Sequence, residues 1–181
     1  RRRLCGLFGF VFSIGISRPA NAIPPLMVAA DIASPELEGF WKKGHFFVGK
    51  PHEKGNPGIK PLQGHKPVQF PADLSTWTAV GETCQQEPKG VGQFGGSPIH
   101  ALVAGDPMHP KIQLWMSNRP VAEALLGRPA SVCSIHIGNA DGIPGPEIIT
   151  TWRTGAPNPT RGFTVFRVPE ALDPTPVRSP N

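Results

Sequence analysis

Proline and glycine interrupt this chain so often that short elements joined by turns are the expected structure. The 181 residues include 23 prolines and 21 glycines. Proline removes a helical hydrogen bond, and glycine costs a helix about 1 kcal/mol relative to alanine. Both residues are spread between short apolar runs, a pattern typical of strands joined by turns. The sequence therefore predicts a mostly β fold, a β-sandwich or open barrel with one or two short peripheral helices. An α+β fold is the alternative.

Six runs are expected to form strands. Residues 111–117 alternate most clearly, with their apolar side chains on one face and mainly polar side chains on the other. The turn residues at 105–107 would reverse the preceding strand, so residues 99–117 are predicted to form a hairpin. The expected strands are residues 77–80, 99–104, 111–117, 131–137, 147–153 and 163–168.

Two segments carry the start and stop residues of short helices. The first runs from Ser34, a hydroxyl cap followed by proline, to Gly44. The second runs from Asn118, with Pro120 in its first turn, to Gly127. We expect both helices at the rim of the β structure.

The first 22 residues have the three parts of an export signal. Three arginines precede an apolar run over residues 4–16, and a segment ending in Ala20-Asn21-Ala22 follows. As a helix the apolar run would span roughly 20 Å, against ~30 Å for the hydrocarbon core of a bilayer. We expect cleavage after Ala22; an uncleaved membrane anchor is the alternative.

The leader also resembles a twin-arginine export signal. Adjacent arginines precede Leu4, glycines dilute the apolar run, and Arg18-Pro19 stands just before the expected cut. The usual Ser/Thr-Arg-Arg-x-Phe-Leu-Lys pattern is only partly met. The resemblance implies transport of a folded protein into the bacterial periplasm or the thylakoid lumen.

The net charge of +5 comes mostly from this leader. Four of the 18 Lys and Arg residues lie in it, so residues 23–181 carry 14 against 13 Asp and Glu, a net charge of +1. Such a surface has no long-range field for attracting anionic polymers. Nucleic acid is therefore not an expected partner.

Two cysteines remain after cleavage, because Cys5 is removed with the leader. In an oxidising compartment we expect Cys84 and Cys133 to form a disulfide, which would stabilise the fold by roughly 4 kcal/mol on a chain-entropy estimate. Two free buried thiols are the alternative.

A basic loop is the best candidate for a partner-binding surface. Residues 49–67 combine frequent Gly and Pro with concentrated positive charge, and loops of this length usually have a function. Alternatively, the lysines only keep the loop soluble. The candidate partner-binding residues are Lys50, His52, Lys54, Lys60, His65 and Lys66.

Metal ligands form a second set of candidate site residues. In the expected strand 131–137, alternation places Val132 and His136 on one face and Cys133 on the other, so one ion could not use both Cys133 and His136. Imidazole and thioether groups near the hairpin tip suit copper or zinc. These candidate ligands are His100, Met108 and His109. No cofactor is otherwise expected.

No catalytic motif appears in the sequence, and the expected function is docking. We expect an export signal over 1–22, a single β-rich domain over 23–168 and a Pro-rich tail over 169–181. The expected role is a non-enzymatic accessory protein that binds a protein partner, as an extrinsic subunit of a membrane-embedded complex in the periplasm or thylakoid lumen. It would not insert into the membrane after cleavage.

Two other functions remain open at this point. One is an exported metal-binding protein or enzyme that uses His100, His109 or His136, and the other is a domain tethered by an uncleaved anchor. The sequence also leaves open whether four aromatic residues form core or contact surface. These are Trp41, Phe46, Phe47 and Trp77.

Overall fold

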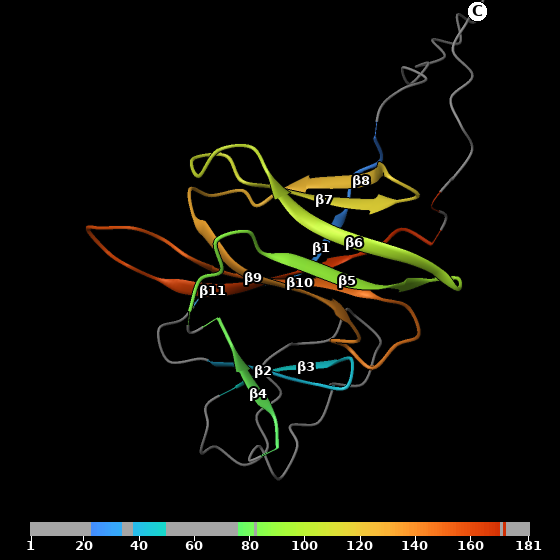
Figure 1. The fold of residues 1–181 in the computed structure, drawn as a ribbon. Coiled ribbons are helices and arrows are strands. Elements are labelled where there is room, and N and C mark those ends of the chain that lie inside the picture. Colours follow the sequence, from blue (N-terminus) through green and yellow to red (C-terminus); the bar gives the residue numbers. More distant parts are fainter. Residues whose placement is uncertain (1–22, 34–37, 50–75, 82, 171, 173–181) are drawn as a thin grey trace, which may run out of the picture.

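The computed structural model describes residues 23–33, 38–49, 76–81, 83–170 and 172. Within these residues there are eleven strands and no helix, arranged in three antiparallel sheets (Figure 1). The mostly β prediction is therefore confirmed. The strands are β1 (Met27–Ala33), β2 (Glu38–Lys42), β3 (His45–Gly49), β4 (Thr78–Val80), β5 (Lys89–Phe94), β6 (Ser97–Ala104), β7 (Lys111–Met116), β8 (Arg119–Leu125), β9 (Ser131–Gly138), β10 (Glu147–Arg153) and β11 (Arg161–Arg167).

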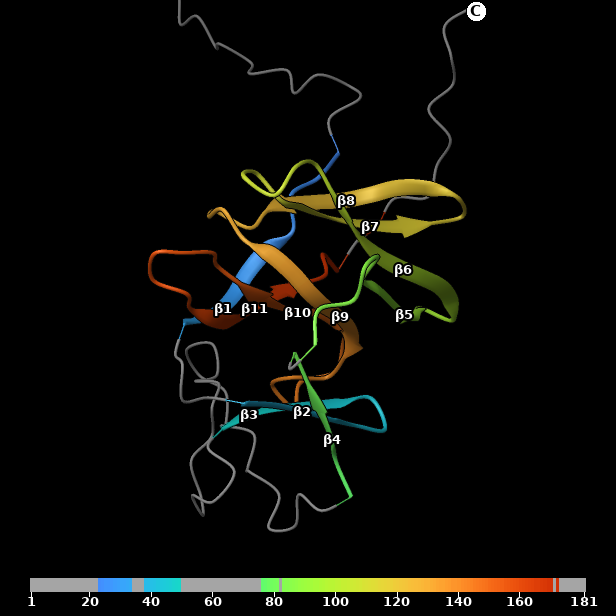
Figure 2. The same ribbon diagram turned by 60° about the vertical axis from the view of Figure 1, so that its left-hand side comes forward.

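The three sheets form layers, with one sheet in the middle. The central sheet has the strand order β1-β11-β10-β9, the outer sheet β5-β6-β7-β8, and the small sheet β3-β2-β4. Figures 1 and 2 show the outer sheet on one side of the central sheet and the small sheet on the other. Strands β9, β10 and β11 of the central sheet are therefore largely covered on both faces, and six of the seven residues of β10 are buried.

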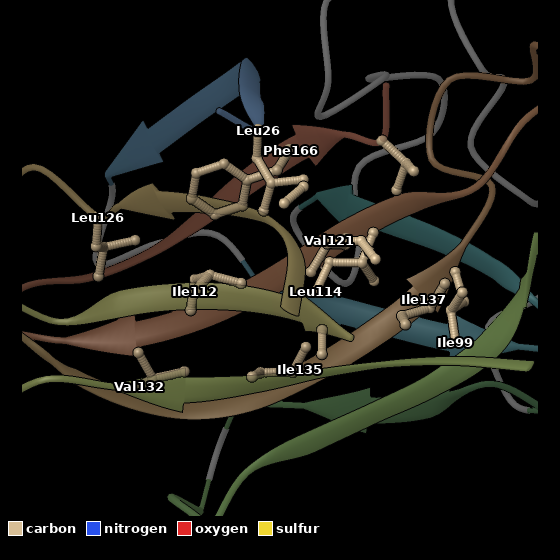
Figure 3. Close-up of a cluster of buried hydrophobic side chains, with 14 of the residues drawn as sticks. Leu26, Ile99, Ile112, Leu114, Val121, Leu126, Val132, Ile135, Ile137 and Phe166 are labelled. Atoms are coloured by element: carbon tan, nitrogen blue, oxygen red, sulfur yellow. The ribbon is translucent and has the colours of Figure 1, made fainter. Parts of the chain in front are cut away.

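Alternation along the central strands supplies two separate cores. In β10, Ile148 and Trp152 belong to core 1, between the central and outer sheets, whereas Ile149 belongs to core 2, beneath the small sheet. Figure 3 shows the side chains of core 1 gathered between the sheets. The buried residues of core 2 are Phe46, Val48, Ala140, Ile149, Phe163 and Val165.

The central and outer sheets meet at both of their edges. At one edge, Leu26 N donates to Glu123 O of β8 (2.8 Å) and Glu123 N donates to Pro24 O (3.0 Å), just before the chain enters β1. At the other edge, β5 lies against β9 because Gly92 has no side chain; a Cβ there would lie 2.5 Å from Ile137 Cγ2. The two sheets thus form a partly open barrel around core 1, consistent with the predicted sandwich or open barrel.

The small sheet is docked on the loop that follows β9. Asn139 N donates to Gly44 O (2.8 Å), and Phe46 N donates to Asn139 O (3.2 Å), which forms a parallel bridge between His45 and Asn139. The ring of Trp41 packs on Gly138, where a Cβ would lie 2.4 Å from the ring.

All six predicted strands are present, with bounds that shift by at most two residues. The predicted hairpin is also confirmed, because β6 and β7 pair from Ile99↔Met116 to Ala104↔Lys111. Leu172 lies beyond the expected end of the domain, yet it is buried in core 1 at 7% exposure.

Both predicted helices are wrong. Residues 38–42 form β2 and residues 119–125 form β8, while 34–37 lie outside the described residues. The reason lies in two tight turns: Lys43-Gly44 (φ 48° and 79°) and Ser117-Asn118 (φ 52° and 61°) have positive φ at both central residues. Such turns join antiparallel strands, so Gly44 and Asn118 are hairpin residues and do not cap helices.

Candidate binding cleft beside the disulfide

A cleft of about 810 Å³ opens where three segments meet at one end of the barrel. The segments are 84–89, which leads into β5, the β6–β7 loop with the end of β6, and 130–132 at the start of β9. Their strands can be followed in Figure 1. The lining residues are Cys84, Gln85, Gln86, Glu87, Pro88, Lys89, Leu102, Val103, Gly105, Asp106, Pro107, Pro110, Ala130, Ser131 and Val132.

The predicted disulfide between Cys84 and Cys133 is present and forms part of this end of the molecule. Its two halves differ: Cys84 is exposed and lines the cleft, whereas Cys133 is fully buried in β9. A main-chain bond from Gln85 N to Cys133 O (2.9 Å) lies beside the disulfide. Together they fasten the segment before β5 to the central sheet.

Cys133 lies at a bulge in β9. The ladder with β10 pairs Thr151 with Ser134 and then Trp152 with Val132, so Cys133 has no partner residue. The extra residue reverses the alternation, and Val132 therefore joins Ile135 in core 1. The prediction that Val132 faces the same way as His136 is wrong for this reason.

The opposite wall of the cleft is a well-braced loop. Asp106 Oδ1 accepts hydrogen bonds from Met108 N (2.7 Å) and His109 N (2.9 Å), and these bonds lower the pKa of Asp106. Ala130 N donates to Pro107 O (3.0 Å), which ties the loop to the start of β9. This wall is therefore preformed by local hydrogen bonding.

The cleft combines apolar surface with groups that suit recognition of a polypeptide. Apolar residues line the cleft, among them Leu102 and Val103, and the neighbouring Gln85 and Gln86 are both exposed at its wall. An amide side chain both donates and accepts, which matches the N–H and C=O groups of a main chain. Among the described residues that line the cleft, Ser131 has the one hydroxyl group and there is no histidine.

The basic loop over residues 49–67 is the partner-binding surface predicted from the sequence. Lys50, His52, Lys54, Lys60, His65 and Lys66 all lie outside the described residues. Their partner-binding role stays a prediction.

The predicted metal ligands are spread over the outer sheet and its loop. His100 lies on β6 with its ring stacked on Trp115 (6.1 Å between centroids), and burial and nearby Lys89 lower its pKa. Met108 and His109 are exposed on the β6–β7 loop. His100 is four residue steps from Ala104, where β6 ends and the loop begins, a distance of about 13 Å along the strand. Within the described part of the chain, no three His, Cys, Asp or Glu side chains form a potential metal site.

His136 packs between two sheets. Its ring lies 4.8 Å from Trp41 and 6.4 Å from Phe46, both of which come from the small sheet. Nε2 is buried without a hydrogen-bond partner, and burial lowers the pKa of His136. The side chain therefore fills space as a neutral ring at the small-sheet contact.

The four aromatic residues left open by the sequence divide into two groups. Phe46 is buried in core 2, and Trp41 packs against the same core. Phe47 and Trp77 instead contact each other edge to face (4.7 Å), with Lys42 Nζ 5.9 Å from the Trp77 ring. Both members of this second pair are half-buried.

A buried acidic pair, which no sequence motif indicated, closes the β9–β10 loop. Arg167 Nη2 pairs with Asp141 and lies 3.9 Å from Glu147 Oε1. Glu147 Oε2 also accepts a hydrogen bond from Ala140 N (3.0 Å). Burial, with a smaller contribution from Asp141, raises the pKa of Glu147 to about 7. The approach of Arg167 to these carboxylates depends on the register of β10 against β11, which pairs Glu147 with Arg167.

Among the residues that the structure describes, no helix is long and apolar enough to cross a bilayer. No family model matches the sequence, and no curated protein or solved structure is significantly similar to it.

Proposed function

We propose that this chain is an exported, non-enzymatic docking protein that binds a protein partner in the cleft beside the disulfide. The observation that carries the proposal is the cleft itself. Its volume of about 810 Å³ lies within the roughly 300–1,000 Å³ of typical ligand sites, and braced segments form its walls. Its paired amides and apolar side chains suit an extended peptide segment.

The leader and the disulfide support a location outside the cytosol. Disulfides persist in oxidising compartments, and the leader has the organisation of an export signal. We assign the protein to the bacterial periplasm or extracellular space, or to the thylakoid lumen. Its partner there would be a membrane-embedded complex that it joins as an extrinsic subunit, with residues 23–168 as the binding domain.

Filling the cleft tests the proposal. Ser131 is exposed and lines the cleft, so Ser131→Trp should obstruct it without disturbing either core. Asn158→Trp adds the same side chain to the exposed β10–β11 loop, which contributes no residue to the lining of the cleft, and serves as the matched control. The tagged full chain and both variants would be incubated with native membranes and recovered with their bound proteins.

We expect Ser131→Trp to lose at least about 90% of the specifically bound partner, because an anchor pocket contributes a large share of binding energy. Asn158→Trp should retain it. If both variants bind as the original chain does, the cleft is not the docking site. Matching thermal unfolding midpoints would establish that the variants are folded.

The basic loop is a second proposed contact with the same partner. Changing Lys50, Lys54, Lys60 and Lys66 to Glu should weaken attachment and reduce its dependence on salt, because screened charge pairs steer association. Binding would be measured at low and high ionic strength. Unchanged binding and an unchanged salt dependence would remove the loop from the interface.

A further inference from the structure

Of the two cysteines in the disulfide, one is accessible from the cleft and the other is not. Cys84 is exposed and lines the cleft, whereas Cys133 is 0% exposed and does not. A thiolate that enters the cleft therefore meets Cys84 first, and Cys133 is placed as the leaving group. Thiol–disulfide exchange depends on which sulfur is attacked and on access to it.

The segment that carries Cys84 can move without loss of the cores. Residues 83–87 are all exposed, and none of them belongs to core 1 or core 2. The segment is linked to β9 by the disulfide and by the bond from Gln85 N to Cys133 O. The β5–β6 ladder begins only at Lys89, which pairs with Leu102. Opening the disulfide would thus alter one wall of the cleft and leave both cores in place.

Breaking the disulfide at Cys133 should disturb the pairing of the central sheet very little. At the bulge, Cys133 has no partner residue on β10, so a change at this position does not break a regular strand pair. The flanking pairs, Thr151↔Ser134 and Trp152↔Val132, hold β9 on either side.

We propose that the Cys84–Cys133 disulfide undergoes thiol–disulfide exchange with a cysteine-bearing segment of the partner seated in the cleft. This inference rests on the proposed function, because it assigns the class of group that the docked partner presents. The adjacent amides of Gln85 and Gln86 would align the main chain of that segment beside Cys84.

The exchange is balanced without a further reagent. The partner's thiol loses its proton, and its sulfur attacks Cys84 Sγ to form a new S–S bond. The bond between Cys84 and Cys133 breaks, and Cys133 leaves as a thiolate that takes up a proton. One disulfide replaces another, so no electrons are gained or lost overall. Attack of the Cys133 thiolate on Cys84 reverses the step and releases the partner.

The test uses the purified full chain, with Cys5→Ser to remove the third thiol. The chain is incubated without denaturant with a short peptide that contains one cysteine, and separately with glutathione as the small-thiol comparison. Remaining thiols are alkylated, and mass spectrometry locates each adduct. Ser131→Trp and Gln86→Trp obstruct the cleft from different walls, and Asn158→Trp is the control.

We expect the peptide adduct on Cys84 and the alkylating agent on Cys133. Each cleft variant should slow formation of the peptide adduct at least about tenfold but change the glutathione rate by less than about twofold, because the smaller thiol needs less of the cleft. Asn158→Trp should change neither rate. The use of two cleft variants keeps the test valid if one of them fails to fold.

Three results would overturn the proposal: no adduct before the chain is denatured, adducts on Cys133, or peptide rates that neither cleft variant alters. Loss of membrane capture in Ser131→Trp together with an unreactive disulfide would leave the docking function standing and remove the exchange. Rapid exchange that depends on the cleft, without membrane capture that depends on it, would leave the exchange standing and remove the docking function.

Discussion

At Glu147, burial opposes the charge that a glutamate ordinarily carries at neutral pH. Its side chain is 3% exposed, and Asp141 shares the same arginine, Arg167. These surroundings raise its pKa from 4.5 to about 7. The folded chain therefore holds a proton that the unfolded chain has already released. The free energy of unfolding should fall as pH rises from 4.5 to about 7, by about 3 kcal/mol in total.

Glu147→Gln tests this linkage. The neutral amide can still accept the hydrogen bond from Ala140 N, so the variant should gain stability over the original chain as pH rises. We expect a difference near zero at pH 5 and about 2–3 kcal/mol in favour of the variant at pH 8, measured by urea unfolding. Glu170→Gln, at an exposed position, is the control. A difference that does not change with pH would contradict the assignment.

Single residues were predictable from the sequence where their role does not depend on the register between strands. The disulfide was predictable because only two cysteines follow the leader, Cys84 and Cys133. The bulge at Cys133 was not, because it arises from the register of β9 against β10. The environment of Glu147 likewise requires Arg167, which lies on the neighbouring strand β11.

At the level of elements, strands flanked by clear turn residues were predictable and tight hairpins were not. The β6–β7 hairpin has a loop whose Asp and Pro residues mark the turn. The β2–β3 and β7–β8 hairpins instead turn on Lys43-Gly44 and Ser117-Asn118, whose flanking residues also fit helix caps. Pairing with a neighbouring strand decides whether such a segment forms a hairpin or a helix, and the sequence of one segment does not show which strand it will pair with.

The β7–β8 turn provides a test of this correction. A turn with positive φ at both central residues favours Asn-Gly, so Ser117→Asn with Asn118→Gly should stabilise the fold by about 0.5–1 kcal/mol in urea unfolding. In a helix, the added glycine would be destabilising. A clear loss of stability in this double variant would therefore argue against the hairpin.

At the level of the whole molecule, the closure of the barrel depends on glycines in β5. Gly90 and Gly92 allow β5 to approach Ile135 and Ile137 of β9, and the disulfide fastens the chain just before this contact. The sequence predicted a sandwich or open barrel correctly, but it did not reveal β5 as a strand. Gly90 and Gly92 lower the strand propensity of β5, yet the close packing of β5 on β9 requires them.

Gly92→Ala tests the closure. The new Cβ would lie 2.5 Å from Ile137 Cγ2, so β5 or Ile137 must shift, and we expect a loss of about 1–3 kcal/mol in urea unfolding. Gly155→Ala introduces the same methyl group where nothing lies within 4 Å, and it should change stability by less than about 0.5 kcal/mol. Equal effects of the two substitutions would refute the close contact.

The most direct measurement of the docking function is site-specific photocrosslinking in native membranes. A photoreactive side chain would replace Gln86, in the wall of the cleft, or Asn158, outside it; both positions are exposed. We expect one discrete crosslinked membrane protein from position 86 and none from position 158. The same products from both positions, or no product from position 86, would contradict the assignment of the cleft as the partner site.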